Sequence, residues 1–227
     1  PQSRWSAWWR RQFHFDRRGQ ASVKSVELEQ LEQRVAEFVA GPGRNFLVET
    51  DLRLTDRVAM NVVASSVFSE EEELARIDQL RDYQRALFDA GLAWIAGPVE
   101  LGGGGLPKEA DVCVRNVLSG HPFPDNTLVR TGSQVLGPSM LAYGSDEVRQ
   151  DFLPKVHRGD LLVCQLFSEP DAGSDLANIK TKAERAPGGW VINGQKVWSS
   201  GAKFADFGVC IARTDPDSKR HAGLSAF

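Results

Sequence analysis

Apolar residues recur every three to four positions over much of the first two thirds of the chain, a spacing that places them on one face of an α-helix. The pattern over residues 26–39 predicts a first helix, which the breaker sequence at 41–43 ends. The pattern over residues 74–88 predicts a second helix. Ser69 and Glu72 precede it in the spacing of a capping box, so we expect this helix to begin just after Ser69.

Further helical stretches follow. The spacing predicts helices over residues 107–119 and 125–143, and Ser145 is placed to cap the next one. Pro154 disturbs the later part of that helix, because proline lacks the backbone N–H that a helix interior uses. Residues 25–160 are therefore expected to form an all-helical domain.

The pattern changes at residues 161–167, a compact apolar run of strand length. Asn193-Gly194 is the strongest hairpin signal in the chain and is expected to join strands at 190–192 and 196–198. Other strands are expected at residues 179–186, 207–212 and 223–227. The sequence thus predicts an α+β fold, in which an antiparallel, β-barrel-like domain over 161–227 follows the all-helical domain.

The two ends of the sequence indicate a fragment. Residues 224–227 read as a strand in progress, and a chain that stops there leaves the backbone hydrogen bonds of its partner strand unanswered. The chain begins with proline, and its two methionines are internal. We therefore expect an incomplete β domain.

Composition and charge exclude several functions. The 27 basic residues against 30 acidic ones give a formal net charge of −3, which argues against a nucleic-acid partner. The cysteines are odd in number and widely spaced, as expected in a reducing compartment: the cytoplasm, or alternatively the mitochondrial matrix. The histidines lack zinc-site spacing, so no metal is expected, and no apolar run is long enough to span a bilayer.

Residues 1–24 form a basic amino-terminal segment that contains a single acidic residue, Asp16. Between Trp5 and Phe15 the aromatic side chains share one side of a predicted amphipathic helix, and arginines occupy the other. Such a helix suits docking on the protein body or on a partner subunit, which is the commoner role. Contact with an anionic membrane is the lesser alternative, and an organelle transit peptide ranks below both.

The glycine run at 102–105 does not qualify as a phosphate-binding loop. Leu106-Pro107 follows it in place of the Gly-Lys-Ser/Thr sequence that enters a helix, and helices rather than a strand precede it. We interpret it as a mobile turn between two helices. No Gly-x-Ser-x-Gly sequence is present, so a hydrolytic triad has no support.

Two segments carry candidate chemistry. The segment at 168–175 combines proline, glycine and two serines directly after an apolar strand, and its exposed amides suit an anionic or heterocyclic ligand. The segment at 193–202 ends a predicted strand with Trp198, followed by two hydroxyls, and an indole there suits one face of a flat conjugated ring. Taken alone, the first segment is more typical of an ordinary loop between strands, and the second is equally typical of a tryptophan that packs in the core. Their combination in this order is far more specific.

Together with the helical half, the glycine turn and residues 142–147, these segments resemble the flavin-dependent acyl-CoA dehydrogenases. The resemblance extends over residues 74–227. It implies an amino-terminal helical domain and a middle β domain, with the family's carboxy-terminal helical domain absent from this chain. It also implies flavin adenine dinucleotide (FAD) as the cofactor.

The resemblance assigns roles to seven residues. Backbone groups would lie along the flavin at Gln165, Leu166, Phe167 and Ser168, the last also through its hydroxyl. Ser174 would contact the cofactor pyrophosphate or the acyl-CoA substrate. Trp198 and Ser200 would pack on the isoalloxazine ring and hydrogen-bond it near the nitrogen that accepts hydride.

The sequence departs mildly from the family pattern at four positions. An aromatic residue is common where Gln165 stands, and asparagine is frequent at Gly201. Threonine is usual at Ser168 and Ser200, so the hydroxyl chemistry is retained at both.

The reaction implied is α,β-dehydrogenation of an acyl-CoA thioester, in which a carboxylate removes the α-proton while hydride leaves the β-carbon. The family supplies this base from the carboxy-terminal domain, so no catalytic residue is assigned here. Glu169 lies in the right loop, but its turn context favours a carboxylate that caps backbone amides, which lowers its pKa.

Two alternatives remain open at this point: a non-catalytic acyl-CoA- and flavin-binding subunit of a hetero-oligomer, and an acyl-CoA oxidase. The resemblance further implies a homo- or hetero-tetramer, with electron-transfer flavoprotein as the electron acceptor. The acyl chain of the substrate lies beyond what the sequence specifies.

Overall fold

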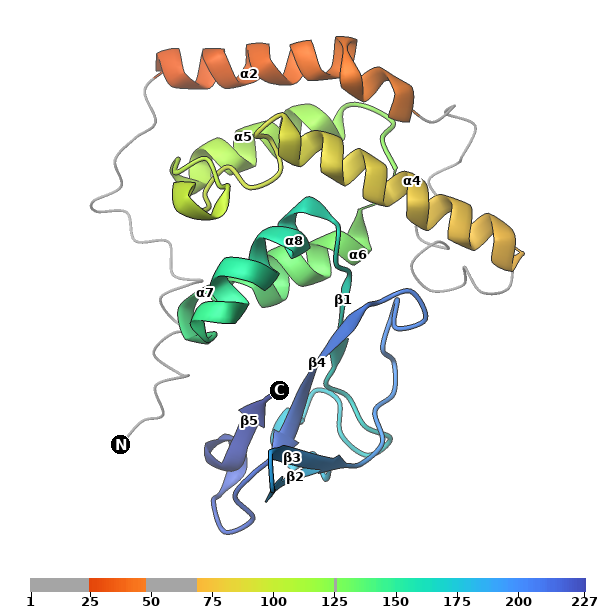
Figure 1. The fold of residues 1–227 in the computed structure, drawn as a ribbon, viewed down its shortest axis with the longest axis vertical. Helices are drawn as coiled ribbons and strands as arrows, with labels where there is room; N and C mark the ends of the chain where they lie inside the picture. Colours follow the sequence, from red (N-terminus) through yellow and green to blue (C-terminus); the bar gives the residue numbers. More distant parts are fainter. Residues whose placement is uncertain (1–24, 48–68, 125) are drawn as a thin grey trace. The chain divides into compact units, whose positions relative to one another are not determined.

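A computed structural model describes residues 25–47, 69–124 and 126–227 (Figure 1). The described residues divide into two compact units. One comprises Val23–Leu166 and Trp198–Val209, and the other comprises Phe167–Val197 and Cys210–Phe227. The amphipathic helix predicted between Trp5 and Phe15 lies outside the described residues.

The first unit begins with the predicted helices, which are α2 (Ser25–Ala40), α4 (Glu70–Asp89) and α5 (Lys108–Ser119). The predicted capping box of α4 is confirmed, because the Ser69 hydroxyl accepts from the Glu72 N–H at 3.2 Å. The Glu72 carboxylate in turn accepts from the Ser69 N–H at 2.8 Å. Both bonds satisfy amides that the first turn of a helix leaves free.

The apolar faces of these helices meet in one core. Phe38 of α2 packs against both Tyr83 of α4 and Phe123, and the rings of Tyr83 and Phe123 stack with centroids 4.8 Å apart. Arg34 of α2 also donates to the carbonyl of Ala90 at 3.0 Å, covering the end of α4. Residues from α2 thus both bury the apolar face of α4 and satisfy its last carbonyls.

The helix predicted over 125–143 is wider in its middle than an α-helix. It consists of α6 (Thr127–Arg130), a π-helical turn (Thr131–Leu136) and α7 (Gly137–Tyr143). The next helix likewise has a π-helical turn (Val148–Phe152) before α8 (Leu153–Arg158). Each π turn ends two residues before a proline, Pro138 or Pro154, which is the second residue of the following α-helix. Because proline removes one donor from the α-helical ladder, the wide turn re-satisfies the backbone around it.

The run at 102–105 is a turn between two helices, as predicted, but a tightly packed one. The amides of Gly103, Gly104 and Gly105 donate to the carbonyls of Pro98, Trp94 and Gly97 at 2.8–2.9 Å. A Cβ atom at Gly103 would come within 2.2 Å of the Gly97 backbone. The glycines therefore allow close backbone approach, and these amides are not available to a phosphate.

The strands are β1 (Val163–Leu166), β2 (Lys182–Ala186), β3 (Gly189–Asn193), β4 (Phe207–Arg213) and β5 (Leu224–Ala226). Short 3₁₀ turns occur at Pro42–Phe46, Val99–Leu101, Leu176–Asn178 and Arg220–Gly223. Antiparallel pairs form between β2 and β3 and between β4 and β5, but β2 and β4 pair in parallel. The α+β class is confirmed, and the sheet is mixed rather than wholly antiparallel.

The hairpin predicted at Asn193-Gly194 is wrong. β3 pairs instead with the preceding strand, and the two-residue turn is Pro187-Gly188, with Gly188 at φ 86°. Residues 196–198 form no strand. Gly194 provides close approach, since a Cβ atom there would lie 2.2 Å from the Thr181 hydroxyl oxygen. The chain leaves the sheet at this point because its next residues bond to the segment that follows β1.

Candidate cofactor-binding site

Ser168 lies at the start of a tight turn in the second unit. Its carbonyl accepts from the Val197 N–H at 2.9 Å, and the next residue, Glu169, exchanges backbone hydrogen bonds with Ala172 at 2.7 and 3.2 Å. Among the described residues, none lies within hydrogen-bonding distance of the Ser168 N–H or hydroxyl. Ser168 is half-buried, so it offers one backbone donor and one hydroxyl on a fixed backbone.

Glu169 is a structural carboxylate, in agreement with its predicted capping role. Its side chain is 5% exposed and accepts from the Lys180 N–H at 2.6 Å, the Thr181 N–H at 2.9 Å and the Lys196 Nζ at 2.9 Å. Burial alone would raise the pKa of this carboxyl, but hydrogen bonds from Thr181, Lys180 and Lys196 outweigh burial and lower the pKa to about 2. A group so acidic and so fully bonded is unsuited to removing a proton from carbon.

Ser174 is exposed on the same turn, next to an open pocket of about 590 Å³ that Asp175 helps to line. The pocket has a cationic wall made of Lys180, Lys182, Arg213 and Arg220. The Arg213 guanidinium is held by the carbonyl of Ala177 at 2.7 Å. The lining carries four cations and the carboxylate of Asp175, and Lys180 is also ion-paired with Asp171 at 2.6 Å; the remaining positive charge suits phosphate groups.

Trp198, in the first unit, has an unusual backbone for a bulky residue. Its φ is 58°, and its side chain is 90% exposed. The Trp198 carbonyl accepts from the N–H of Ser200 at 3.0 Å, and the Ser200 residue is exposed. A large ring held in solvent by a left-handed backbone is the kind of strain that gathers at ligand sites.

Gly201 completes this turn with φ 76°. A Cβ atom there would lie 1.9 Å from Leu128 Cδ2, so the turn packs directly on α6. The buried Ser199 hydroxyl beside it has no partner among the described residues. The left-handed angle explains why glycine serves at a position where the family often has asparagine.

The remaining predicted residues lie on or just after β1. Gln165 and Leu166 are half-buried at the end of this strand in the first unit. Phe167 follows in the second unit, and its carbonyl accepts from the Lys196 Nζ at 3.0 Å. Sequence reasoning did not single out Lys196, because nothing in the local pattern signals that a lysine three residues after Asn193 is buried.

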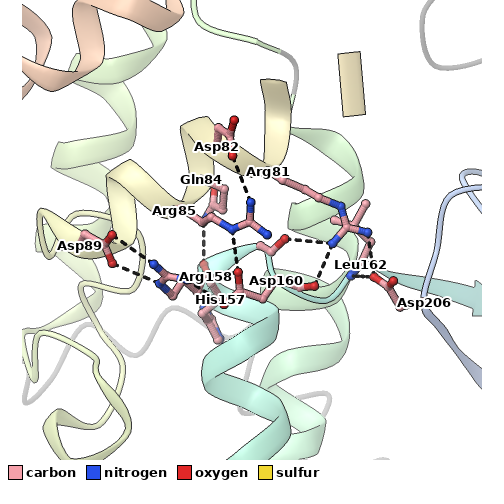
Figure 2. A network of polar contacts seen from close by, with 11 residues as sticks. Arg81, Asp82, Gln84, Arg85, Asp89, His157, Arg158, Asp160, Leu162 and Asp206 are labelled. Carbon is pink, nitrogen blue, oxygen red and sulfur yellow. Dashed lines mark hydrogen bonds and ion pairs between the residues drawn. The ribbon is translucent and has the colours of Figure 1, made fainter. Parts of the chain in front are cut away.

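A polar network anchors the far end of the Trp198 segment to α4 (Figure 2). Arg81 donates to the Asp206 carboxylate at 2.9 Å and to the Asp160 carbonyl at 2.8 Å, and the Leu162 N–H donates to Asp206 at 2.8 Å. Arg85 and Arg158 bind the Asp160 carboxylate at 2.7 and 2.9 Å. The network fixes the loop before β4 to the helices.

Comparisons with known proteins agree with this architecture. The profile of the acyl-CoA dehydrogenase N-terminal domain matches residues 50–160, and that of the acyl-CoA dehydrogenase middle domain matches residues 164–227. The chain belongs to the acyl-CoA dehydrogenase family.

Named relatives support this membership. The chain is 43% identical over 148 residues to acyl-CoA dehydrogenase FadE34 of Mycobacterium tuberculosis, covering 63% of this chain and 20% of that protein. In the ChsE4-ChsE5 complex from the same organism, one chain matches with a TM-score of 0.62 and 28% identity, covering 92% of this chain and 48% of that one. PigA, solved with FAD and proline, shares the fold with a TM-score of 0.61 at 20% identity, over 92% of this chain and 49% of its own. The chain thus spans a fifth to a half of the length of these proteins.

Proposed function

We propose that this chain supplies the helical and flavin-contacting parts of an FAD-dependent enzyme that dehydrogenates an acyl-CoA thioester between its α and β carbons. The observation that carries the proposal is the state of Trp198. It is almost fully exposed in a left-handed backbone, and it directly follows Val197, which bonds the Ser168 carbonyl. An exposed indole held in this way fits one face of a flat ring.

The described residues fit the chemistry of FAD. The free N–H and hydroxyl of Ser168 suit the polar edge of the ring system, and the exposed hydroxyl of Ser200 suits the same role from the first unit. Backbone groups of Gln165, Leu166 and Phe167 would line the flavin. When bound, FAD supplies the hydride acceptor. The protein residues hold its ring in place and orient it.

The substrate side of the proposal rests on Ser174 and its neighbouring pocket. Ser174 would contact the acyl-CoA or the cofactor pyrophosphate, and it is exposed as that role requires. The pocket beside it has the cationic wall described above, which includes Arg213 and Arg220. Coenzyme A carries several phosphate groups, which such a wall recognises by charge-assisted hydrogen bonds.

We assign no catalytic base among the described residues. Glu169 is excluded from that role by its three hydrogen bonds and its low pKa. We propose that the proton is taken by a carboxylate of the carboxy-terminal domain that the family resemblance implies.

Reconstitution tests the proposal. The purified 227-residue chain is incubated with FAD, freed of unbound cofactor by gel filtration and examined by visible spectroscopy. We expect the protein fraction to retain the flavin absorbance. A Trp198→Ala variant should retain less, since the exposed indole is removed. A wild-type chain that stays colourless contradicts the proposal.

A second candidate function is a binding subunit that relies on a partner for catalysis. This candidate is favoured by the Glu169 carboxylate, which is ion-paired with Lys196 and therefore unsuited to act as a base. It is also favoured by one structural relative, whose crystal structure is that of a ChsE4-ChsE5 complex. If the intact gene product alone reduces an artificial electron acceptor in the presence of acyl-CoA, this candidate is excluded. Oxygen consumption in the same assay identifies an acyl-CoA oxidase, the further alternative.

Partners and compartment complete the proposal. We propose a homo- or hetero-tetramer that passes electrons to an electron-transfer flavoprotein in the cytoplasm, with the mitochondrial matrix as the alternative. None of the described helices has the length and apolar character needed to cross a membrane. The division into a basic segment (1–24), a helical domain (25–160) and a β domain (161–227) also remains a prediction.

A further inference from the structure

We propose that Lys196, through its buried ion pair with Glu169, is a positioning residue for the flavin site. It holds the backbone at Phe167 and Ser168 so that the Ser168 N–H and hydroxyl stay free for the cofactor. This inference rests on the proposed function, and it deepens it by naming a pair of residues that neither touch the ring nor take part in the reaction.

The pair is buried and fully bonded. The Lys196 side chain is 9% exposed and that of Glu169 is 5% exposed, and Nζ donates to the Glu169 carboxylate at 2.9 Å. The same Nζ donates to the Phe167 carbonyl at 3.0 Å. Removing two charges from water is costly, so a buried pair adds little net stability compared with apolar residues of the same volume. The pair contributes more to the geometry of the turn than to its stability. A buried charge must keep its hydrogen-bonding partners, so the pair fixes where the Phe167 carbonyl and the Glu169 carboxylate lie.

Lys196 and Val197 act on consecutive carbonyls. The Lys196 Nζ donates to the carbonyl of Phe167, and the Val197 N–H donates to the carbonyl of Ser168. The next residue after Val197 is Trp198. Two adjacent residues therefore set the register between the turn that carries Ser168 and the segment that leads into the exposed indole.

The Glu169 carboxylate also connects the Ser168 turn to the sheet. We call this set of bonds made by Lys196 and Glu169 the clamp. The Glu169 carboxylate also accepts from the N–H groups of Lys180 and Thr181, the two residues that precede β2. The Thr181 carbonyl in turn accepts from the Arg213 N–H at 2.8 Å in β4. The clamp thus connects the Ser168 turn to paired strands, which are stiffer than a free loop.

The loss of Lys196 should weaken FAD binding, because it loosens the alignment between the Ser168 turn and the segment at 196–197. In a Lys196→Met variant the Phe167 carbonyl loses its donor and the Glu169 charge loses its partner. The Val197 bond to Ser168 and the backbone bonds between Glu169 and Ala172 then remain to hold the turn. The loss of the two hydrogen bonds that the Lys196 Nζ donates should lower FAD affinity by about tenfold or more.

The test uses the 227-residue chain and four variants. Lys196→Met breaks the pair, and Lys196→Arg keeps a cationic donor at this position. The double variant Lys196→Met/Glu169→Gln removes both charges and so leaves no buried charge unpaired. The matched control is Lys203→Met, which breaks the ion pair between Lys203 and Glu73, 2.6 Å long, at a half-exposed position in the first unit. FAD affinity is measured by fluorescence titration, and the environment of the bound ring by visible circular dichroism.

We expect Lys196→Met and the double variant to lose FAD affinity by about tenfold or more and to alter the visible circular dichroism of the remaining bound flavin. The double variant should regain much of the melting temperature lost by Lys196→Met without regaining FAD affinity, whereas Lys196→Arg should regain both in part. Lys203→Met should bind FAD as the wild type does. Wild-type affinity and an unchanged spectrum in Lys196→Met overturn the proposal, as does recovery of affinity in parallel with stability in the double variant.

Amide hydrogen exchange provides a readout without the cofactor. In the Lys196→Met variant, exchange should rise in peptides covering 167–172 and 196–200 and remain unchanged in β4 and β5. Uniformly faster exchange indicates a purely structural role and contradicts the inference. If the wild type binds no FAD, the proposed function fails for this chain, while the exchange experiment still decides whether Lys196 positions the turn.

Discussion

The imidazole ring of His157 lies flat against the indole of Trp94, with ring centroids 3.7 Å apart and an interplanar angle of 8°. His157 is 5% exposed, and its Nδ1 has no hydrogen-bond partner among the described residues. Burial lowers the pKa of this imidazole to about 3. The ring therefore packs as a neutral aromatic group at neutral pH, and burial disfavours its charged form in the folded protein.

His157 should make the folded protein sensitive to acid. Unfolded histidine takes up a proton near its ordinary pKa of about 6.5, whereas folded His157 does so only near pH 3. The unfolded state thus binds the additional proton between these values. The stability supported by neutral His157 is present above about pH 6.5 and is lost as the pH falls toward 3, with a slope of up to about 1.4 kcal/mol per pH unit.

Denaturation by urea at several pH values measures this slope. A His157→Phe variant should lose less stability than the wild type over the same pH range, since phenylalanine stacks on Trp94 but does not titrate. His221→Phe, at an exposed histidine, is the control and should follow the wild type. Parallel curves for wild type and His157→Phe contradict the prediction.

Glu169→Gln should destabilise the chain at neutral pH. The amide leaves the buried Lys196 charge without its partner, which costs about 3–5 kcal/mol. The folded pKa of Glu169 is lowered to about 2, so the stability from its charge is present above about pH 4.5 and is lost as the pH falls toward 2. The gap between variant and wild type should therefore narrow across that window. A gap that stays constant with pH shows that the carboxylate charge does not carry the effect.

Gly201→Ala should destabilise the turn after Trp198 by about 1–3 kcal/mol. The new methyl group meets Leu128 at 1.9 Å, and φ of 76° is unfavourable for alanine. Leu128→Ala should relieve the clash but not the backbone strain, so the double variant recovers only part of the loss. Gly189→Ala is the control, because nothing lies within 4 Å of a Cβ atom there. Thermal melts that rank the two glycine variants equally are the contrary result.

Trp198→Ala should lower FAD affinity by about two- to tenfold, the range expected for one aromatic packing contact. Because the side chain is 90% exposed, the melting temperature of the free chain should not fall. Trp190→Ala provides the opposite case, since Trp190 packs against Phe227 with centroids 5.2 Å apart and beneath Arg185. That variant should lose stability and keep its FAD affinity. Equal FAD affinity for Trp198→Ala and wild type contradicts the proposed contact.

Local signals in the sequence predicted the elements that local chemistry determines. The capping box at Ser69 and Glu72 involves residues three apart, and the structure has both of its bonds. The cap role of Glu169 was also evident from its turn. Its donors Lys180, Thr181 and Lys196 were not, because they reach it only through the tertiary fold.

The main error was the hairpin at Asn193-Gly194, where a strong local turn signal was overridden by distant contacts. Pro187-Gly188 forms the turn instead, and the residues after Gly194 are drawn to the Ser168 segment by the bonds of Lys196 and Val197. The predicted roles of the seven site residues depend on the same long-range arrangement together with a ligand. They remain predictions, tested by the FAD experiments above.

The π turn at Thr131–Leu136 allows a residue to be added to or removed from the continuous helical segment of α6, the π turn and α7, which we call the rod. A wide turn holds one residue more than the α-helical repeat, so the rod accommodates that residue without forming a loop. Deleting a single residue there would close the turn to ordinary α-helix and leave the side chains from Gly137 onward in nearly the same phase about the axis, whereas the same deletion within a regular α-helix rotates all later side chains by about 100°. Gly137, buried near Leu153 and His157, would then keep its place. The phase of this rod, more than its length, is what the packing against α8 constrains.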